Sequence, residues 1–510
     1  MITITPGRLT LGDLRSMAEK RQSVELDPSC RDAITRGAEA VASIAERGEP
    51  AYGVNTGFGR LANTHIPREQ LELLQKNLVL SHAVGIGEPF APEVVRLLLL
   101  LKIASLARGH SGVSLELVEA LIALLNNDVL PVIPSKGSVG ASGDLAPLAH
   151  MATILIGVGE VNIQGERATA QAGLAAAGLK TMVLHPKEGL ALLNGTQAST
   201  ALALRNLFAI EDLWRSGIVS GSLSVDAAAG SITPFDPRIH QLRGHPGQID
   251  AAAAYRSLLK DSGITVSHQD CEKVQDPYSL RCQPQVMGAC LDLIRNAANT
   301  LVIEANAVSD NPLVFPDTLE VLSGGNFHAE PVAFAADTLA IAAAEIGALA
   351  ERRIALLIDS SLSGLPPFLV RDGGVNSGFM IAHVTAAALA SENKTLAHPA
   401  SIDSLPTSAN QEDHVSMATF AARKLTDICA NVAGIIAIEL LAAAQGIDLR
   451  QPYLTSPSLA PVVQLIRTHV PHYDIDHYLA PDIQSVIELV SSGQIAAYAP
   501  IGLPSLGNAQ

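Results

Sequence analysis

Long apolar segments rich in alanine constrain the fold of this chain more than any other feature of its sequence. Several of them extend past the length of an average helix. Alanine favours the helical backbone, and its small side chain lets neighbouring helices approach closely. Strand-like patterns are few and short, and most lie near the N-terminus. The sequence therefore predicts an all-α fold, an elongated bundle of long helices that covers residues 188–214, 284–305, 330–358 and 414–444.

Shorter helices are predicted in a loop-rich N-terminal region, over residues 67–80, 114–125 and 144–157. Apolar residues in these segments recur at the helical period, and Asp144 stands where the N-cap of the third helix is expected. The sequence shows no convincing repeat or linker between the helices. We therefore expect a single all-α unit of residues 1–510, with approximate lobes at residues 1–200, 201–450 and 451–510.

The charge balance limits the possible partners. The chain carries a formal net charge of −16, which argues against binding to nucleic acid or to an acidic membrane surface. Only 16% of its residues are charged and 48% are hydrophobic, so much of the surface is expected to be buried, and a homo-oligomer explains this best. The apolar runs at residues 94–107 and 432–446 are shorter than a membrane span and contain charged residues. We therefore predict no membrane segment.

Cysteine usage indicates a reducing compartment. The five cysteines, Cys30, Cys271, Cys282, Cys290 and Cys429, are scattered, odd in number and form no C-x-x-C pair. No secretory leader is recognisable at the N-terminus, so we predict a cytoplasmic location. His268 and Cys271 are an isolated pair of potential ligands, and we predict no metal site.

The glycine-rich stretch GSVGASGDL, residues 137–145, lies between two predicted helices. Its spacing is G-x-x-G-x-x-G, and no strand pattern precedes it, which argues against a dinucleotide site. It also lacks the Gly-Lys-Ser/Thr ending of a P-loop and the G-x-S-x-G pattern of a hydrolase elbow. Taken alone, the stretch is a glycine-rich turn at the start of a helix.

Other motifs change this interpretation. They are AYGVNTGFG (51–59), LVLSHAVGIG (78–87), EGLALLNGTQAS (188–199), QDPYSLRCQPQVMG (275–288), SDNPLVF (309–315), GGNFHAEPVA (324–333) and PTSANQEDHVS (406–416). Together with residues 137–145, they closely resemble the aromatic amino acid ammonia-lyases, and best of all the members that act on histidine. The resemblance extends from about Leu9 to the C-terminal region.

The resemblance implies elimination of ammonia from L-histidine to give trans-urocanate, the first step of histidine degradation. It also implies no external cofactor, because the family forms an electrophile, 4-methylidene-imidazol-5-one (MIO), from its own backbone. In this chain Ala141, Ser142 and Gly143 match the precursor. Their residue types suit the cyclisation, since glycine lets its nitrogen approach closely, serine carries a hydroxyl that can leave, and alanine is small.

The resemblance also assigns residues around this electrophile. Tyr52 matches the base that removes the β-proton, and it lies in a loop with three glycines. Asn194 and Phe327 match positions beside the MIO ring, and Tyr278 matches a supporting position. The helix that starts near Leu145 points its N-terminus at the precursor, so we hypothesise that this helix end stabilises developing negative charge.

Further matches concern the substrate. Arg281 matches the arginine that binds the substrate carboxylate, with Gln275 beside it. His82 and Glu412 match positions that histidine-specific members use near the imidazole ring, and Met380 is a further candidate for the pocket wall. Whether the amine or the imidazole attacks MIO is not decided by the sequence. The family forms homotetramers whose active sites combine loops from several chains, in agreement with the low charge fraction.

Three other functions stay open at this point. The same scaffold serves tyrosine or phenylalanine ammonia-lyases and aminomutases. A helical scaffold without catalytic activity would also keep the motifs. A serine hydrolase would pair Ser142 with His82 or His414, although no hydrolase elbow accompanies the serine.

Overall fold

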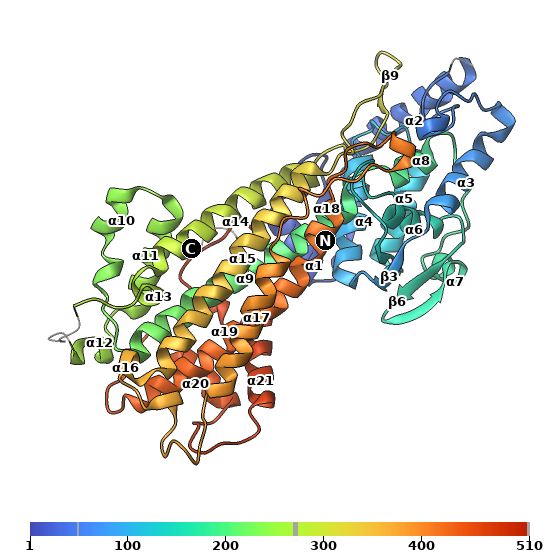
Figure 1. Cartoon of the computed structure of the whole chain (residues 1–510). Coiled ribbons are helices and arrows are strands. Elements are labelled where there is room, and N and C mark those ends of the chain that lie inside the picture. Colours follow the sequence, from blue (N-terminus) through green and yellow to red (C-terminus); the bar gives the residue numbers. More distant parts are fainter. Residues whose placement is uncertain (48–49, 269–273, 507–510) are drawn as a thin grey trace. The chain divides into compact units, whose positions relative to one another are not determined.

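Helices dominate the protein, as the sequence predicts (Figure 1). The computed structural model describes residues 1–47, 50–268 and 274–506. These residues group into two compact units. Unit 1 consists of Met1–Arg205, Ala298–Asp337 and Pro399–Arg423, and unit 2 of Asn206–Ala297, Thr338–His398 and Lys424–Gln510. Each unit therefore combines distant parts of the chain, unlike the consecutive lobes expected from the sequence, and the expectation of one catalytic unit stays a prediction.

The helices of unit 1 confirm the short helices predicted in the N-terminal region. The predicted segments 67–80, 114–125 and 144–157 correspond to α3, α5 and α6, and Ser114 caps α5 by accepting from the Leu117 backbone N–H. The helices are α1 (Leu11–Glu19), α2 (Ser29–Arg47), α3 (Leu71–His82), α4 (Pro92–Leu106), α5 (Leu115–Asn126), α6 (Leu145–Thr153), α7 (Ala170–Ala176), α8 (Glu188–Leu193) and α18 (Ala418–Arg423), with short 3-10 turns η1 (Gly59–Leu61), η2 (Arg68–Gln70) and η5 (Ser408–Asn410).

Short strands form small sheets in unit 1. Strands β1 (Ile2–Ile4) and β2 (Val24–Leu26) pair in parallel, with Ile2 opposite Val24. The other pairs are antiparallel: β3 (Ile86–Pro89) with β5 (Pro134–Lys136), β6 (Glu160–Ile163) with both β4 (Val129–Pro131) and β7 (Glu166–Thr169), and β8 (Leu313–Phe315) with β9 (Glu320–Leu322). Most of these strands lie in the first third of the chain, as the sequence predicts.

Long helices form most of unit 2. They are α9 (Gln197–Ala227), α14 (Gln283–Ala305), α15 (Glu330–Ile358), α17 (Met380–Leu396) and α19 (Leu425–Leu449), and the first three have one end in unit 1. Within unit 2, α19 packs against α17 and α21. Shorter helices complete the unit: α10 (Pro237–Arg243), α11 (Pro246–Leu259), α12 (Gly263–Ser267), α13 (Tyr278–Arg281), α16 (Ser360–Ser363), α20 (Ala460–His469) and α21 (Ala480–Ser491), with η3 (Thr233–Phe235), η4 (Pro367–Leu369) and η6 (Ala496–Tyr498).

Two segments predicted as continuous are interrupted in the structure. Residues 414–444 are divided between α18 and α19. Residues 188–214 are divided between α8 and α9, because Asn194 leaves the helical conformation (φ −86°, ψ 134°) and Gly195 adopts φ +131°. Apolar periodicity continues through this break, which is why the sequence does not reveal it. The backbone that leaves the helix here belongs to the candidate site.

A buried ion pair stabilises unit 2. Arg353 of α15 and Glu439 of α19 are both fully buried, and Arg353 Nη2 donates to Glu439 Oε2 at 2.9 Å. Ser220 and Ser224 of α9 each donate a hydroxyl to the same carboxylate at 2.7 Å. Since each carboxylate oxygen has partners, the charge is tolerated inside an apolar bundle.

Three helical segments are long and apolar enough to cross a membrane by length and composition: Gln283–Ala305, Glu330–Ile358 and Ala418–Leu449. Their most apolar windows are 44%, 67% and 83% buried inside the protein. The prediction that the chain has no membrane segment is not tested by these observations and stays a prediction.

We expect Glu439→Gln to lower the free energy of unfolding of unit 2 by about 3–5 kcal/mol, because Arg353 would keep a buried charge without a countercharge. Guanidinium unfolding followed by circular dichroism measures the loss. Asp250→Asn is the matched control, since Asp250 and Arg295 form a pair in the same unit at 2.6 Å whose side chains are 40% and 32% exposed. The control should cost about 1 kcal/mol or less. Equal losses in the two variants would contradict the assigned importance of the buried pair.

Candidate active site

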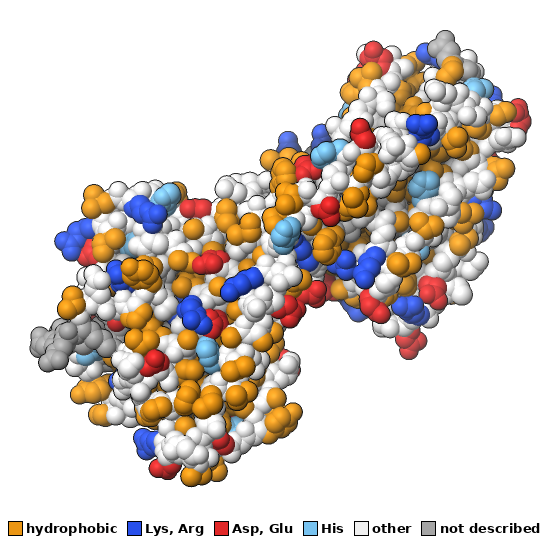
Figure 2. Space-filling model, viewed as in Figure 1, with side chains coloured by type: hydrophobic (Ala, Val, Ile, Leu, Met, Phe, Trp, Pro, Cys, Tyr) orange, Lys and Arg blue, Asp and Glu red, His pale blue; other side chains and the backbone are white. Residues whose placement is uncertain are grey.

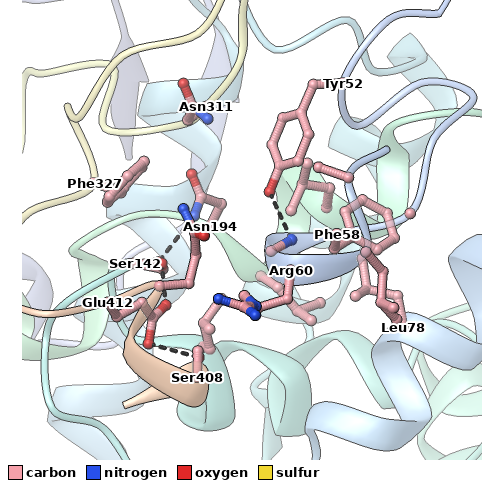
Figure 3. Close-up of a pocket in the computed structure, with 18 of the residues that line it drawn as sticks. Tyr52, Phe58, Arg60, Leu78, Ser142, Asn194, Asn311, Phe327, Ser408 and Glu412 are labelled. Carbon is pink, nitrogen blue, oxygen red and sulfur yellow. Dashed lines mark hydrogen bonds between the residues drawn. The ribbon is translucent and has the colours of Figure 1, made fainter. Parts of the chain in front are cut away.

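A cavity of about 1200 Å³ lies in unit 1 and brings together seven of the residues singled out by the sequence (Figure 3). In Figure 3, Ser142, Asn194, Glu412 and Phe327 lie on one side of the cavity, and Tyr52 faces them from the other. The segments that supply these side chains are far apart in the sequence. The predicted residues that line the cavity are Tyr52, His82, Ala141, Ser142, Asn194, Phe327 and Glu412.

Close contact between two backbones shapes the glycine-rich loop. Gly143 (φ +74°) forms a bridge with Gly195, and a Cβ atom at Gly143 would stand 2.3 Å from the Gly195 carbonyl oxygen. The Asp144 N–H donates to that same oxygen at 2.8 Å. A side chain at position 143 would therefore force the two segments apart, and only glycine suits both the torsion angle and the space.

The Asp144 carboxylate anchors this loop. Its Oδ1 accepts from the Ser138 hydroxyl at 2.9 Å and from the Thr419 hydroxyl at 2.7 Å. Its Oδ2 accepts from the backbone N–H and the hydroxyl of Ser199, at 2.7 and 2.9 Å. Asp144 thus occupies the N-cap position of α6, as predicted, but its side chain makes no capping bond to α6 and instead caps the first turn of α9. It ties together three distant segments of unit 1.

Ser142 is bonded at both its carbonyl and its hydroxyl. Asn194 Nδ2 donates to the Ser142 carbonyl oxygen at 2.9 Å. The Ser142 hydroxyl donates to Glu412 Oε1. Asn194 Oδ1 is buried and has no hydrogen-bond partner among the described residues. The polar surroundings of Ser142 therefore come from two segments that the sequence separates by about 220 residues.

Hydrogen bonds keep the Glu412 side chain ionised. Its Oε2 accepts from the Thr407 hydroxyl at 2.6 Å and from the Ser408 hydroxyl at 2.9 Å. Burial acts to raise the pKa of Glu412, but the hydrogen bonds from Ser142, Thr407 and Ser408 and the charge of His82 together hold this pKa below its usual value. At neutral pH the cavity therefore contains a carboxylate beside Ser142.

His82 also lines the cavity. It is the last residue of α3, and its Nδ1 lies 2.8 Å from the Leu78 carbonyl oxygen. A carbonyl oxygen only accepts hydrogen bonds, so Nδ1 carries the proton. In the neutral ring, Nε2 is then the acceptor nitrogen.

Tyr52 lies in the loop that closes one side of the cavity. Its hydroxyl oxygen accepts weakly from the Gly59 N–H at 3.4 Å, and its ring contacts Phe58 edge to face with centroids 6.3 Å apart. Gly53 follows it with φ +76°, in a position where a Cβ would stand 2.6 Å from Leu190 Cδ2. The geometry orients the phenol toward the cavity; its role as a base stays a prediction.

Sequence reasoning missed several lining residues, of which Arg60 is the most notable. Its side chain points across the cavity toward Ser408 and Glu412 in Figure 3, and the residue is exposed. Phe58 and Asn311 also line the cavity. Phe58 lies inside the glycine-rich segment 51–59 that contains Tyr52, and Arg60 follows it directly. Because this loop was expected to close over a site, its neighbouring side chains could have been predicted to line the cavity.

Four predicted residues belong to unit 2 and are not among the described residues that line this cavity: Gln275, Tyr278, Arg281 and Met380. Tyr278 is 70% exposed, and the Arg281 guanidinium stacks on its ring at 4.6 Å from the centroid. Met380 begins α17 and is 37% exposed. Their roles in substrate binding stay predictions.

The predictions on metal and cysteine chemistry are also untested. One nitrogen or oxygen atom from each of His328, Glu330 and His414 lies within 4.8 Å of the others, a spacing that could hold a metal ion. Among the described cysteines, Cys30, Cys282, Cys290 and Cys429 are free thiols. Cys271, and with it the His268–Cys271 spacing, lies outside the described residues.

Comparison with known proteins defines the class. The family model for aromatic amino acid lyases matches residues 9–468, so this chain belongs to the aromatic amino acid lyase family and is a carbon–nitrogen lyase. It is 74% identical over 505 residues to the histidine ammonia-lyase of Burkholderia mallei (strain ATCC 23344), covering 99% of this chain and 100% of that protein.

Solved structures agree with this assignment. The histidine ammonia-lyase of Trypanosoma cruzi superimposes with a TM-score of 0.91 at 41% identity, covering 100% of this chain and 98% of that chain. A tyrosine aminomutase from Streptomyces globisporus gives a TM-score of 0.91 at 36% identity, covering 98% of each chain. The fold is therefore shared by enzymes named for different substrates, and side chains in the cavity must distinguish them.

We expect Asp144→Ala to destabilise unit 1 by about 3 kcal/mol or more, because its four hydrogen-bond donors lose their acceptors in a buried position. Asp144→Asn should cost less, about 1–2 kcal/mol, since its amide keeps one oxygen toward Ser199 while the hydroxyls of Ser138 and Thr419 can rotate to accept. Differential scanning calorimetry measures both variants. An Asn variant as unstable as the Ala variant would show that the negative charge, rather than the hydrogen bonds, is what matters.

Proposed function

We propose that the chain is a histidine ammonia-lyase, which eliminates ammonia non-oxidatively from L-histidine to give trans-urocanate and so begins histidine degradation. The observation that carries the proposal is the environment of Ser142. Its carbonyl oxygen accepts from Asn194 and its hydroxyl donates to Glu412 at the wall of a large cavity. The full-length similarity to histidine ammonia-lyases supports the choice of substrate.

The reaction needs an electrophile, because an amine is a poor leaving group and the β-hydrogen of histidine is weakly acidic. We propose that Ala141, Ser142 and Gly143 form MIO. The Gly143 nitrogen bonds to the Ala141 carbonyl carbon, whose oxygen leaves as water with the amide hydrogens of Gly143 and Ser142, so that a C=N bond forms between the Ala141 carbon and the Ser142 nitrogen. The Ser142 hydroxyl then leaves with the α-hydrogen as a second water. The formed ring supplies an electrophilic methylidene carbon to the substrate.

The local geometry fits this ring. Gly143 already has the torsion angle and the missing Cβ that a tight backbone requires, and the Gly195 segment holds it from one side. Because the Ser142 carbonyl becomes the ring carbonyl, the Asn194 amide donates to the oxygen on which electron density would accumulate. The N-terminus of α6 follows directly and acts in the same direction.

The other residues of the cavity bind and deprotonate the substrate. Tyr52 is proposed to remove the β-proton from the side opposite Asn194, with Phe327 packing beside the ring. His82 and the Glu412 carboxylate can hydrogen-bond an imidazole, whereas a phenyl ring would leave His82 Nε2 and, once Ser142 is dehydrated, Glu412 Oε1 without a partner, at a cost of roughly 1–3 kcal/mol each. Tyrosine or phenylalanine lyases and aminomutases on the same scaffold are the alternative.

We further propose a cytoplasmic homotetramer in which another copy supplies Gln275, Tyr278, Arg281 and Met380 to the site. A guanidinium suits the substrate carboxylate. Apolar side chains are spread over the face drawn in Figure 2, and α17 alone exposes Ile381 by 63% and Val384 by 55%. Such surface suits contact with another subunit. Neither nucleic acid nor a membrane is part of the proposal.

The decisive experiment compares the wild-type protein with Ser142→Ala. We expect the wild type to release urocanate from histidine, and its Ala141–Gly143 peptide to lack the mass of two water molecules. Ser142→Ala has no hydroxyl to lose and should reduce turnover by several orders of magnitude. Tyrosine is the competing substrate. Faster turnover of tyrosine would replace the substrate assignment, and a wild-type peptide of unmodified mass would refute the mechanism.

We expect Glu412→Gln to lower kcat/KM for histidine by about 10- to 100-fold, from the loss of one charged hydrogen-bond partner. Thr407 and Ser408 still donate to Glu412 after Ser142 has lost its hydroxyl, so we expect the wild-type carboxylate to stay ionised from pH 6 to pH 9 and the ratio of variant to wild type to be constant over this range. Rates are normalised to the dehydrated fraction of each protein, because Glu412 also contacts Ser142. A ratio that approaches one toward pH 6 would mean that Glu412 titrates in that range.

A further inference from the structure

Lys102 is a buried lysine that the mechanism above does not use. It lies in α4, within the apolar segment VVRLLLLLKIASLA, and is only 1% exposed. Its Nζ donates to the carbonyl oxygen of Ala191 at 3.0 Å and to that of Asn194 at 2.8 Å. Both acceptors lie at the C-terminal end of α8, where carbonyl groups lack partners within the helix. The lysine therefore caps α8 from inside the protein.

One of these two acceptors belongs to the backbone that holds the MIO precursor. The Asn194 carbonyl is part of the peptide unit joining Asn194 to Gly195. On one side of this unit, the Asn194 side chain donates to the Ser142 carbonyl at 2.9 Å. On the other side, Gly195 contacts Gly143 and accepts from the Asp144 N–H at 2.8 Å. A rotation of this single peptide would disturb both contacts to the precursor.

A lysine at this buried position would lower the stability of the protein if its side chain served packing alone. Burial lowers the pKa of Lys102 to about 7, which reflects the free energy needed to keep an amine in the protein interior. A long apolar side chain would pack in the same segment without this cost. The amine is, however, the group that can hold two carbonyl oxygens at once.

We propose that Lys102 is a positioning residue for the cyclisation of Ala141, Ser142 and Gly143, because its amine fixes the Asn194–Gly195 peptide against which the precursor is held. This inference rests on the proposed function, since it presumes that MIO forms. Lys102 is not among the described residues that line the cavity, and it reaches the site only through the Asn194 carbonyl. Its effect is therefore expected first on ring formation, and any effect on turnover by the formed ring acts through Asn194.

The test measures the dehydrated fraction of the Ala141–Gly143 peptide by mass spectrometry in folded, purified full-length protein. We expect Lys102→Met to reduce this fraction about tenfold, from the loss of two hydrogen bonds donated by one amine. Turnover is measured per dehydrated subunit, so that an effect through the Asn194 side chain is separated from the effect on ring formation. Lys187→Met is the matched control, since Lys187 is equally buried in unit 1 but bonds to Asp310 at 2.7 Å. The control should lose stability and keep its dehydration.

Each outcome decides the proposal. A folded Lys102→Met protein with wild-type dehydration overturns it, as does an equal loss of dehydration in Lys187→Met. If Lys102→Met does not fold, Lys102→Gln decides instead: its shorter amide cannot reach both carbonyls, so a dehydrated fraction equal to wild type overturns the proposal. If the wild type itself is not dehydrated, the proposed function fails and this inference fails with it. Normal dehydration in the wild type together with normal dehydration in Lys102→Met refutes the role of Lys102 alone.

Discussion

The contact between Gly143 and Gly195 is the constraint on which the candidate site depends. Two backbone segments approach so closely that a single Cβ at residue 143 would collide with a carbonyl oxygen at 2.3 Å. This approach places the Ser142 carbonyl within reach of the Asn194 amide. It also explains why a long apolar stretch is interrupted between α8 and α9, since Gly195 must leave the helix to face Gly143. A compressed backbone of this kind persists only in a rigid frame.

Buried polar groups provide that frame in unit 1. Asp144 accepts four hydrogen bonds from three segments, and Lys102 donates two to the end of α8. Both side chains act on backbone that touches Ala141–Gly143, the proposed MIO precursor, although neither is among the described residues that line the cavity. Glu412 differs from them, because it lies in the cavity wall and its ionised state depends on three hydroxyl donors. The polar residues of the site thus divide into those that hold the backbone and those that line the cavity.

The sequence predicted the helical class, the short N-terminal helices and seven of the residues that line the cavity. It did so through periodicity and through long motifs whose resemblance carried specific positions, such as Asn194 and Glu412. It did not predict the partners of Asp144, because a capping residue is normally assigned to the helix that follows it. Arg60 and Lys102 were missed for a related reason. Arg60 follows a glycine-rich loop and Lys102 lies in an apolar segment, and the neighbouring residues did not indicate which groups either side chain would contact.

The sequence by itself determined that this chain forms long, closely packed helices and that it belongs with the lyases of aromatic amino acids. The alanine content, the helical period of the apolar residues and the glycine-rich motifs are local properties, so they can be recognised in the sequence without a structure. Only the tertiary structure decided that Gly143 is pressed against Gly195, that Asp144 caps α9 and that Lys102 reaches the Asn194 carbonyl. These contacts join residues about 50 to 90 positions apart, and their existence depends on how whole helices pack rather than on any neighbouring residue.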